Sequence, residues 1–237
     1  MMNIAVVLSG GTGTRMGADI PKQYQEAAGK PVIVHTLEQM QRCSAVDGVV
    51  VTASPAWEEQ ILQWKKEFAL AKLLAVVPAG ADRQLSIRSG LLAAEQFMDK
   101  DEMSGVIIQD AVRPLSSVEL LTRLVAELKD ASCVMPVLPV TDTTYTSHDG
   151  QWVDGLLERS ALYGGQAPEA FRYWPYWELY RDTPAAELST MSGSCQLPYS
   201  RGWKVRMIPG ERENIKITYP LDLKICEILL RERKGIS

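Results

Sequence analysis

The residues best suited to chemistry lie near the amino terminus, in a glycine-rich segment that carries two cations. Residues 8–24 read Leu-Ser-Gly-Gly-Thr-Gly-Thr-Arg-Met-Gly-Ala-Asp-Ile-Pro-Lys-Gln-Tyr and directly follow the apolar run Ile4–Leu8. Glycines let backbone N–H groups approach an anion closely, and Arg15 and Lys22 add positive charge that neutral amides do not supply. The segment therefore predicts a binding site for a polyphosphate.

Two common phosphate-binding loops do not fit this segment. A P-loop needs a lysine directly after its last glycine, and here Ala18 follows Gly17. A dinucleotide fingerprint needs a third glycine at a fixed spacing and an acid after the second strand, and the second strand candidate ends in Thr-Ala-Ser. These departures disfavour a nicotinamide-dependent oxidoreductase. A glycine-rich turn with two solvated cations stays open as the simplest alternative.

The composition sets bounds on the class of protein. The 237 residues carry a net charge of −4, which argues against nonspecific binding to nucleic acid, so any anion site must be a local cluster of cations. The two histidines, His35 and His148, are too few for a histidine-rich metal site. We expect His35 to lie in the core or on a helix surface, and His148 in a turn.

The cysteines and the early apolar run bear on the compartment. The four cysteines are far apart and form no C-x-x-C motif, so we expect reduced, mostly buried thiols (Cys43, Cys133, Cys195 and Cys226). The run Ile4–Leu8 is too short for a signal peptide or a membrane span. We therefore expect a cytoplasmic protein with no membrane partner.

The elements that must position these residues alternate between strands and helices. This alternation predicts an α/β fold, with a Rossmann-like, mostly parallel sheet and helices on both faces. Predicted strands are Asn3–Leu8, Gly48–Ala53, Leu73–Val77, Val106–Gln109 and Cys133–Val137; predicted helices are Val32–Arg42, Pro55–Glu67, Leu85–Phe97 and Val118–Lys129. Ser54 and Ser117 are candidate helix caps, at the second and fourth of these helices. Ligands of such sheets bind at the carboxyl ends of the strands, where the glycine-rich segment and Asp110 both emerge.

The pattern changes after the fifth strand. A turn signal at Asp149-Gly150 between short β-prone runs predicts a hairpin, within a protruding arm at about 139–165. Beyond it we expect strands at Lys204–Ile208 and Ile215–Thr218 and a final helix at Pro220–Arg231. We expect residues 1–237 to form a single domain, in which the arm makes the dimer contact; an ordinary surface hairpin is the alternative.

Several ordered motifs together resemble one enzyme family over nearly the whole chain. They are Gly10-Gly-Thr-Gly-Thr-Arg-Met, Pro21-Lys-Gln-Tyr, Gly29-Lys-Pro-Val-Ile-Val-His-Thr, Asp110-Ala-Val-Arg-Pro, Asp142-Thr and Asn214-Ile-Lys-Ile-Thr. The chain resembles the cytidylyltransferases that join CTP to a polyol phosphate and release pyrophosphate. Two members of this family, specific for D-ribitol 5-phosphate and for 2-C-methyl-D-erythritol 4-phosphate, are candidates.

The resemblance implies a role for particular residues of this sequence. Arg15, Lys22 and Lys216 would be catalytic, around the triphosphate. Asp110 would contact the acceptor and hold Mg²⁺, and Thr143 and Arg159 would reach the acceptor phosphate from the neighbouring subunit of a homodimer. The nucleotide would be bound by Leu8, Ser9, Gly10, Gly11, Thr12, Gly13, Gly80, Arg83 and Ser86.

Simpler interpretations remain open at several of these positions. Asp110 could cap a helix, Ser86 could cap a strand-to-helix turn, and Lys216 could be solvated. Arg113 is more simply a structural residue that fixes the loop after the fourth strand. A phosphate monoester is largely ionised at neutral pH, since its second pKa is about 6. The implied reaction therefore needs no general base, in agreement with the scarcity of histidine.

Departures from the family pattern bear on the acceptor. Tyr163 stands where the methylerythritol enzymes usually have tryptophan, which favours D-ribitol 5-phosphate, a precursor of teichoic acid or capsule; isoprenoid synthesis would be the alternative context. Gln109 replaces a histidine, and Ala167-Pro168 stands for Thr-Pro. The segment Thr190–Cys195 lacks an acid that the family normally carries, which leaves room for a non-catalytic CTP-binding paralogue. The retained cations and Asp110 argue against that paralogue.

Overall fold

A computed structural model describes residues 1–11, 20–233 and 235 of the chain. Thr12, Gly13 and Arg15, three of the predicted phosphate-binding residues, lie outside the described residues. The remaining predicted site residues are all described.

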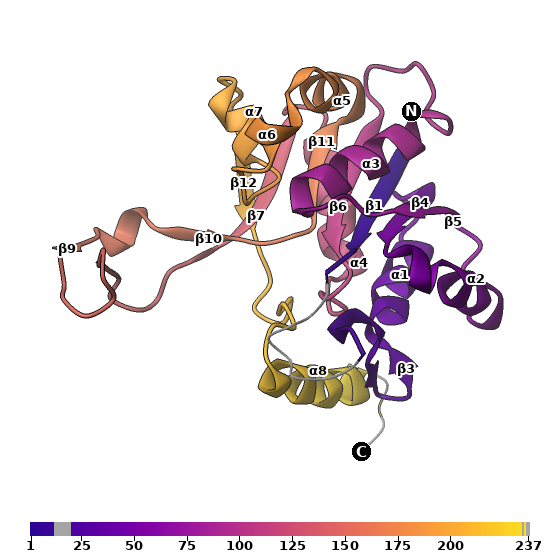
Figure 1. Cartoon of the computed structure of the whole chain (residues 1–237), viewed down its shortest axis with the longest axis horizontal. Coiled ribbons are helices and arrows are strands. Elements are labelled where there is room, and N and C mark those ends of the chain that lie inside the picture. Colours follow the sequence, from indigo (N-terminus) through magenta and orange to yellow (C-terminus); the bar gives the residue numbers. More distant parts are fainter. Residues whose placement is uncertain (12–19, 234, 236–237) are drawn as a thin grey trace.

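A mixed, mostly parallel sheet forms the centre of the molecule (Figure 1). Within the described residues its main path runs β10-β7-β11-β6-β1-β4-β5, and β12 pairs with β7. The strands are β1 (Asn3–Ser9), β4 (Gly48–Ala53), β5 (Leu73–Pro78), β6 (Gly105–Asp110), β7 (Cys133–Pro139), β10 (Tyr163–Gly165), β11 (Glu169–Arg172) and β12 (Arg206–Pro209). The predicted α/β class is confirmed, and β11 lies antiparallel between β6 and β7.

Helices cover both faces of this sheet, as predicted (Figure 1). The helices are α1 (Val32–Arg42), α2 (Glu58–Glu67), α3 (Arg83–Glu95), α4 (Val118–Glu127), α5 (Tyr173–Asp182), α6 (Ala185–Leu188), α7 (Gln196–Ser200) and α8 (Pro220–Arg233). Side chains alternate across a strand, so successive residues of β1 pack into two different hydrophobic clusters, one on each face of the sheet. Ala5 and Val7 pack with α1, α2 and α4, whereas Ile4 and Val6 pack with α3 and α5.

The starts of three helices show which polar side chains act as caps. Ser117 caps α4 as predicted, accepting a hydrogen bond from the Leu120 N–H at 2.9 Å. Ser54 makes no capping hydrogen bond, and the residues after it form a short 3₁₀ turn, η3 (Pro55–Trp57), before α2 begins. Helix α3 begins at Arg83, two residues earlier than predicted, because Asp82 accepts the N–H of Leu85 at 2.9 Å.

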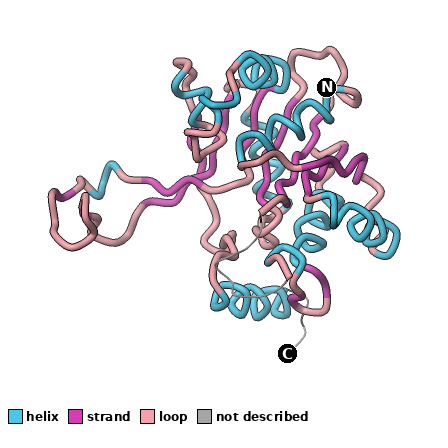
Figure 2. Tube along the Cα trace, in the orientation of Figure 1, coloured by secondary structure: helices cyan, strands magenta, loops and turns pink. Residues whose placement is uncertain are grey.

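The predicted hairpin is present and projects from the body as an arm (Figures 1 and 2). Its strands, β8 (Tyr145–Thr146) and β9 (Gly155–Leu156), pair antiparallel. Gly150 has φ +72°, a conformation that favours glycine, and a carboxylate oxygen of Asp149 accepts the next two backbone N–H groups. A short 3₁₀ turn, η4 (Arg159–Ala161), leads back toward β10.

The carboxyl-terminal part differs from the sequence-based expectation. The predicted strand Ile215–Thr218 is wrong: this stretch is neither helix nor strand, and the Ile217 N–H donates to the Val112 carbonyl at 3.0 Å. Val112 lies in the loop between β6 and α4, so this hydrogen bond does not extend a sheet. The other predicted strand is observed as β12, displaced toward the carboxyl terminus. None of the helices in the described part of the chain is long and apolar enough to cross a membrane.

Candidate functional site

A cavity of about 420 Å³ opens at the carboxyl ends of β1 and β6. Leu8 and Asp110 are register partners in the parallel pair of β1 and β6, so the two strands end at the same edge of the sheet. Every described residue that was predicted to bind the nucleotide or to act in catalysis lines this cavity. These residues are Leu8, Ser9, Gly10, Gly11, Lys22, Gly80, Arg83, Ser86 and Lys216, together with Asp110.

The start of the glycine-rich segment is held by a residue that sequence reasoning did not assign. The buried Gln23 side chain donates hydrogen bonds to the carbonyl oxygens of Ser9, at 2.8 Å, and Gly11, at 2.7 Å. It belongs to the 3₁₀ turn η2 (Lys22–Tyr24), so the same contacts place Lys22 beside the segment. The Pro21-Lys22-Gln23 motif was visible in the sequence. Glutamine is uncharged, however, so its residue type alone did not indicate a role at the site.

The opposite wall of the cavity is the turn that leads into α3. A Cβ atom added to Gly80 would overlap the backbone of Leu85, so only glycine fits there. The Gly80 N–H donates to Ser86 Oγ at 3.1 Å, and Ser86 Oγ donates to the Asp82 carbonyl at 2.7 Å. Asp82, and not Ser86, is the cap of this helix. Ser86 instead ties the turn to the first turn of α3.

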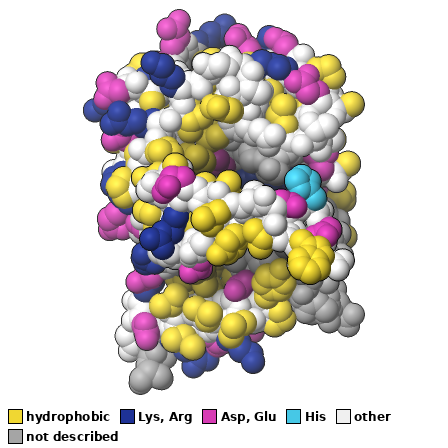
Figure 3. All heavy atoms as spheres, turned by 90° about the vertical axis from the view of Figure 1, so that its left-hand side faces the viewer, with side chains coloured by type: hydrophobic (Ala, Val, Ile, Leu, Met, Phe, Trp, Pro, Cys, Tyr) yellow, Lys and Arg dark blue, Asp and Glu magenta, His cyan; other side chains and the backbone are white. Residues whose placement is uncertain are grey.

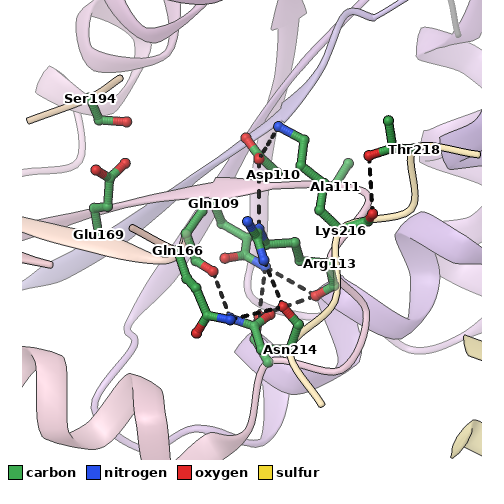
Figure 4. Close-up of polar contacts among 12 residues, drawn as sticks. Gln109, Asp110, Ala111, Arg113, Gln166, Glu169, Ser194, Asn214, Lys216 and Thr218 are labelled. Atoms are coloured by element: carbon green, nitrogen blue, oxygen red, sulfur yellow. Dashed lines mark hydrogen bonds and ion pairs between the residues drawn. The ribbon is translucent and has the colours of Figure 1, made fainter. Parts of the chain in front are cut away.

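Asp110 is the centre of a cluster of cations (Figure 4). Its carboxylate oxygens lie 2.8 Å from Lys216 Nζ, 3.4 Å from an Arg83 Nη atom and 3.8 Å from Arg113 Nε. Burial by itself would raise the pKa of Asp110, but the charges of Arg83, Lys216 and Arg113 outweigh it and hold the pKa well below its usual range. Asp110 is not a helix cap, because it ends β6 and the next helix is capped by Ser117.

Arg83 joins the cavity to a second carboxylate that sequence reasoning missed. One Nη atom of Arg83 lies 3.7 Å from Glu169, and the other donates to Ser194 Oγ at 2.9 Å. Glu169 is 6% exposed, and burial raises its pKa despite the charge of Arg83. The Gly193 carbonyl also accepts from the Gln84 side chain, at 3.0 Å. The unusual segment Thr190–Cys195 therefore contacts the first turn of α3, the helix that carries Arg83.

Arg113 has the structural contacts that its alternative interpretation predicted. Its Nη1 donates to the Asn214 carbonyl at 2.6 Å, while its Nε faces Asp110. The fully buried Gln109 donates to the Arg113 carbonyl at 3.2 Å and to Ser116 Oγ at 3.0 Å. Gln109 thus organises the loop between β6 and α4 from inside, where the family pattern has a histidine.

The arm residues Thr143 and Arg159 are not part of this cavity within one chain. Both are exposed, and Arg159 donates to the Thr141 carbonyl at 3.2 Å, in the same arm. The arm extends away from the body that holds the cavity (Figure 1). Their predicted contact with an acceptor phosphate therefore depends on a second subunit and stays a prediction.

Neither histidine and none of the four cysteines lines the cavity. His35 is buried in α1 with its Nε2 2.7 Å from the Ala27 carbonyl, and the exposed His148 contacts Asp154 in the hairpin turn, as expected. The four cysteines are all free and buried. No group of three or more His, Cys, Asp or Glu side chains that could hold a metal ion occurs in the described part of the chain.

Comparisons with known proteins identify relatives along nearly the whole chain. The family described as IspD: 2-C-methyl-D-erythritol 4-phosphate cytidylyltransferase matches residues 3–232. A ribitol-5-phosphate cytidylyltransferase of Streptococcus agalactiae serotype V is 33% identical, over 99% of this chain and 98% of its own. A 2-C-methyl-D-erythritol 4-phosphate cytidylyltransferase of Rubrobacter xylanophilus is 36% identical, over 98% of this chain and 97% of its own.

Solved structures agree with these sequence matches. The 4-diphosphocytidyl-2C-methyl-D-erythritol synthase of Anaerococcus prevotii has a TM-score of 0.78 and 25% identity, covering 97% of this chain and 98% of its own. The 2-C-methyl-D-erythritol 4-phosphate cytidylyltransferase of Francisella tularensis has a TM-score of 0.79 at 19% identity, over 96% of this chain and 99% of its own, which shows a shared fold. The sequence identities to the two kinds of relative are too similar to separate their acceptors.

Proposed function

Since this chain belongs to the 2-C-methyl-D-erythritol 4-phosphate cytidylyltransferase family, we propose that it transfers CMP from CTP to D-ribitol 5-phosphate. Its family and relatives are polyol-phosphate cytidylyltransferases, which are nucleotidyltransferase enzymes. The observation that carries the proposal is the convergence of Lys22, Arg83 and Lys216 on one cavity that also contains a glycine-rich segment and Asp110. The products would be CDP-ribitol and pyrophosphate.

The proposed step is one substitution at phosphorus. An oxygen of the acceptor phosphate forms a bond to the α-phosphorus of CTP, and the bond to the bridging oxygen of the β-phosphate breaks as pyrophosphate leaves. The attacking oxygen is already largely ionised at neutral pH, since the second pKa of a phosphate monoester is about 6. The chain must therefore bring two anions together and stabilise the charge on the phosphorus centre. We assign this role to Lys22 and Lys216, which both line the cavity.

The cavity also fits a magnesium ion. Mg²⁺ in phosphoryl-transfer sites is commonly bound by one or two carboxylates together with substrate phosphate oxygens. Asp110 supplies such a carboxylate, which is held ionised by its cationic neighbours. When bound, the ion would supply further positive charge beside the triphosphate.

The nucleotide base would lie against the turn at Gly80–Ser86. Cytosine differs from uracil by an exocyclic amine, a donor where uracil has an acceptor, so backbone carbonyls can distinguish them. Gly80 and Ser86 form part of the cavity wall.

The choice of acceptor rests on two observations. Tyr163, the first residue of β10, replaces the tryptophan expected of the methylerythritol enzymes, and relatives named for ribitol 5-phosphate match over the whole chain. The relative named for 2-C-methyl-D-erythritol 4-phosphate, at 36% identity, favours that acceptor as the second candidate.

Pyrophosphate release tests this proposal directly. Wild-type protein is assayed with CTP, UTP, ATP or GTP and Mg²⁺, each with and without ribitol 5-phosphate, 2-C-methyl-D-erythritol 4-phosphate, glycerol phosphate or arabinitol phosphate. We expect acceptor-dependent release with CTP far above UTP, and the highest kcat/KM with ribitol 5-phosphate. Equal release from UTP and CTP would refute the cytidine assignment. A preference for methylerythritol phosphate would replace the acceptor, and no release with any pair would favour the non-catalytic paralogue.

Substitution of the cavity lysines tests their part in the reaction. Lys22→Ala or Lys216→Ala is expected to lower the rate about 10²- to 10³-fold, as for the loss of one preorganised charge-stabilising donor. Lys66→Ala, at an exposed position of α2 remote from the cavity, is the matched control and should keep wild-type turnover. Urea denaturation should show folding preserved in all three. Near-normal turnover in either cavity variant would remove that lysine from the mechanism.

A further inference from the structure

We propose that Asn214 is a positioning residue that holds Lys216 in place against Asp110. The inference rests on the proposed function, in which Lys216 stabilises the charge on the phosphorus centre. In this role Asn214 supports the active site but touches neither the substrate nor the reacting atoms.

Lys216 has little to fix it by itself. It lies in a stretch that is neither helix nor strand, and its side chain is 42% exposed although its Nζ is 2.8 Å from Asp110. A long, half-exposed lysine in a surface ion pair normally retains much of its rotational freedom. Its position must therefore come from the chain on either side, where Asn214 and Ile217 are both 0% exposed.

The Asn214 side chain makes two buried hydrogen bonds, each to a different loop. Its Oδ1 accepts from Ser116 Oγ at 2.9 Å, and its Nδ2 donates to the Ala167 carbonyl at 2.8 Å. Ser116 lies between β6 and α4, and Ala167 lies between β10 and β11. Asn214 therefore ties the Lys216 stretch to two loops that leave the central sheet.

Arg113 links Asp110 to the backbone of the stretch that carries Lys216. It donates to the main-chain carbonyl of Asn214 at 2.6 Å and faces Asp110 at 3.8 Å. The Lys216 stretch and the carboxylate that Lys216 contacts are thus held by one guanidinium group. A displacement of Asn214 would separate Lys216 from Asp110 without altering either residue.

The two glutamines add a further layer of support. Gln109 donates to Ser116 Oγ at 3.0 Å, which fixes the hydroxyl that Asn214 accepts. Gln166 accepts the Glu211 N–H at 3.0 Å and donates to the Glu211 carbonyl at 2.9 Å, three residues before Asn214. Because the path into Asn214 is also fixed, loss of its side chain would release mainly the Lys216 stretch.

The test is a double-mutant cycle between Asn214 and Lys216. A misplacement of about 1 Å in a catalytic group can cost about 10²-fold, so Asn214→Ala should lower kcat for pyrophosphate release about 10- to 10²-fold. The KM for CTP should change less, because Lys22 and Arg83 remain in the cavity. In a Lys216→Ala background the same substitution should have almost no further effect, since the group it positions is gone. Equal losses of kcat in both backgrounds would overturn the proposal.

Asn3 provides a matched control. It is also a buried asparagine that donates to one backbone carbonyl, of Ala45 at 3.1 Å, and accepts one hydrogen bond, from the Gly105 N–H at 3.1 Å. It begins β1, at the end of the strand opposite the cavity. Asn3→Ala should lower the urea midpoint much as Asn214→Ala does while kcat of the folded protein stays near wild type. A similar loss of kcat in both would indicate a general effect of destabilisation.

A measurement that needs no turnover separates this inference from the proposed function. Acetylation of lysines by acetic anhydride, followed by peptide mass spectrometry, reports how freely each amine reacts. Relative to Lys66, Lys216 should be acetylated faster in Asn214→Ala than in wild type, and not in Asn3→Ala. If Asn214→Ala does not fold, Ser116→Ala removes one of its two hydrogen bonds and should act in the same direction. Unchanged acetylation of Lys216 would overturn the positioning role, even if wild-type protein released pyrophosphate.

Discussion

At the scale of single residues, the cavity is an arrangement of cations around few acids. Asp110 forms ion pairs with Lys216, Arg83 and Arg113, and Glu169 forms an ion pair with Arg83. The carboxylates pair with these cations inside the fold, and the excess of positive charge remains for an anionic ligand. Charge placed in advance in this way stabilises a developing negative charge without reorganisation.

The ionisation of these residues predicts the response to pH. Because the pKa of Asp110 is held far below its usual range, its contribution to stability is present above the unfolded pKa and is lost only in strong acid. Turnover should instead fall below about pH 6, where the acceptor phosphate becomes protonated. A pH–rate profile with the natural acceptor and with its phosphonate analogue, whose second pKa is higher, tests this expectation.

Glu169 is the internal control for that profile. Burial raises the pKa of Glu169, so Glu169 is a second group that gains a proton as the pH falls. Glu169→Gln should retain the acidic limb, and the phosphonate should shift the limb to higher pH in both proteins. A limb that disappears in Glu169→Gln would assign it to the enzyme and not to the substrate.

At the scale of elements, the placement of α3 on the sheet positions the turn that we propose to bind the nucleotide. Its first turn carries Arg83 and Ser86, and its side toward the sheet has glycine at position 90. A Cβ atom there would overlap the Val6 side chain of β1 and approach Thr52 of β4. The close approach of helix and sheet therefore depends on Gly90.

Gly90→Ala should destabilise the protein although alanine favours helices. The gain in helix propensity is about 1 kcal/mol, whereas overpacking a filled core costs about 1–3 kcal/mol. The net change in the free energy of unfolding, measured by urea denaturation, should be destabilising, and the KM for CTP should rise as α3 moves outward. At Gly193 an added Cβ would meet no atom within 4 Å, so Gly193→Ala should leave stability near wild type. A more stable Gly90→Ala variant would contradict the packing argument.

At the scale of the whole molecule, the arm is the feature that one chain does not explain. It exposes large apolar side chains, including Trp152 at 77% and Leu156 at 65%. Figure 3, seen from the side toward which the arm points, shows apolar side chains gathered on that face. Exposed apolar groups of this size are typical of a surface that binds another chain. We infer a homodimer in which the arm of each subunit completes the acceptor site of the other.

Mixed dimers test this arrangement. The fork of Arg159 suits a phosphate through two hydrogen bonds, so Arg159→Ala should strongly raise the KM for the acceptor. Mixing Arg159→Ala with Lys22→Ala protein should restore some activity, because one site of the mixed dimer has both an intact cavity and an intact arm. Mass spectrometry of tagged chains verifies subunit exchange. If mixed dimers form without recovering activity, Arg159 does not act across the interface.

The sequence by itself determined the first half of the fold and most of the cavity. The strands β1, β4 and β6 are continuous apolar runs because both of their faces are buried, and such runs are visible without coordinates. The glycine-rich segment, Lys22, Asp110 and Lys216 were evident from residue type and order, since glycines and charges are conspicuous in a chain of ordinary composition. The turn at Gly150 was a local signal of the same kind.

Only the tertiary structure decided what depends on partners distant in sequence. Strand β11 is short and lies antiparallel between β6 and β7, a pairing that no local pattern specifies. Glu169, Gln23 and Asn214 are polar residues whose roles arise from burial beside particular loops, and burial is a property of the assembled molecule. The stretch around Lys216 has the composition of a strand, yet it packs against a loop and α8, and the Ile217 N–H donates to the Val112 carbonyl of that loop. Local sequence set the elements and the charges, whereas long-range packing set which of them meet.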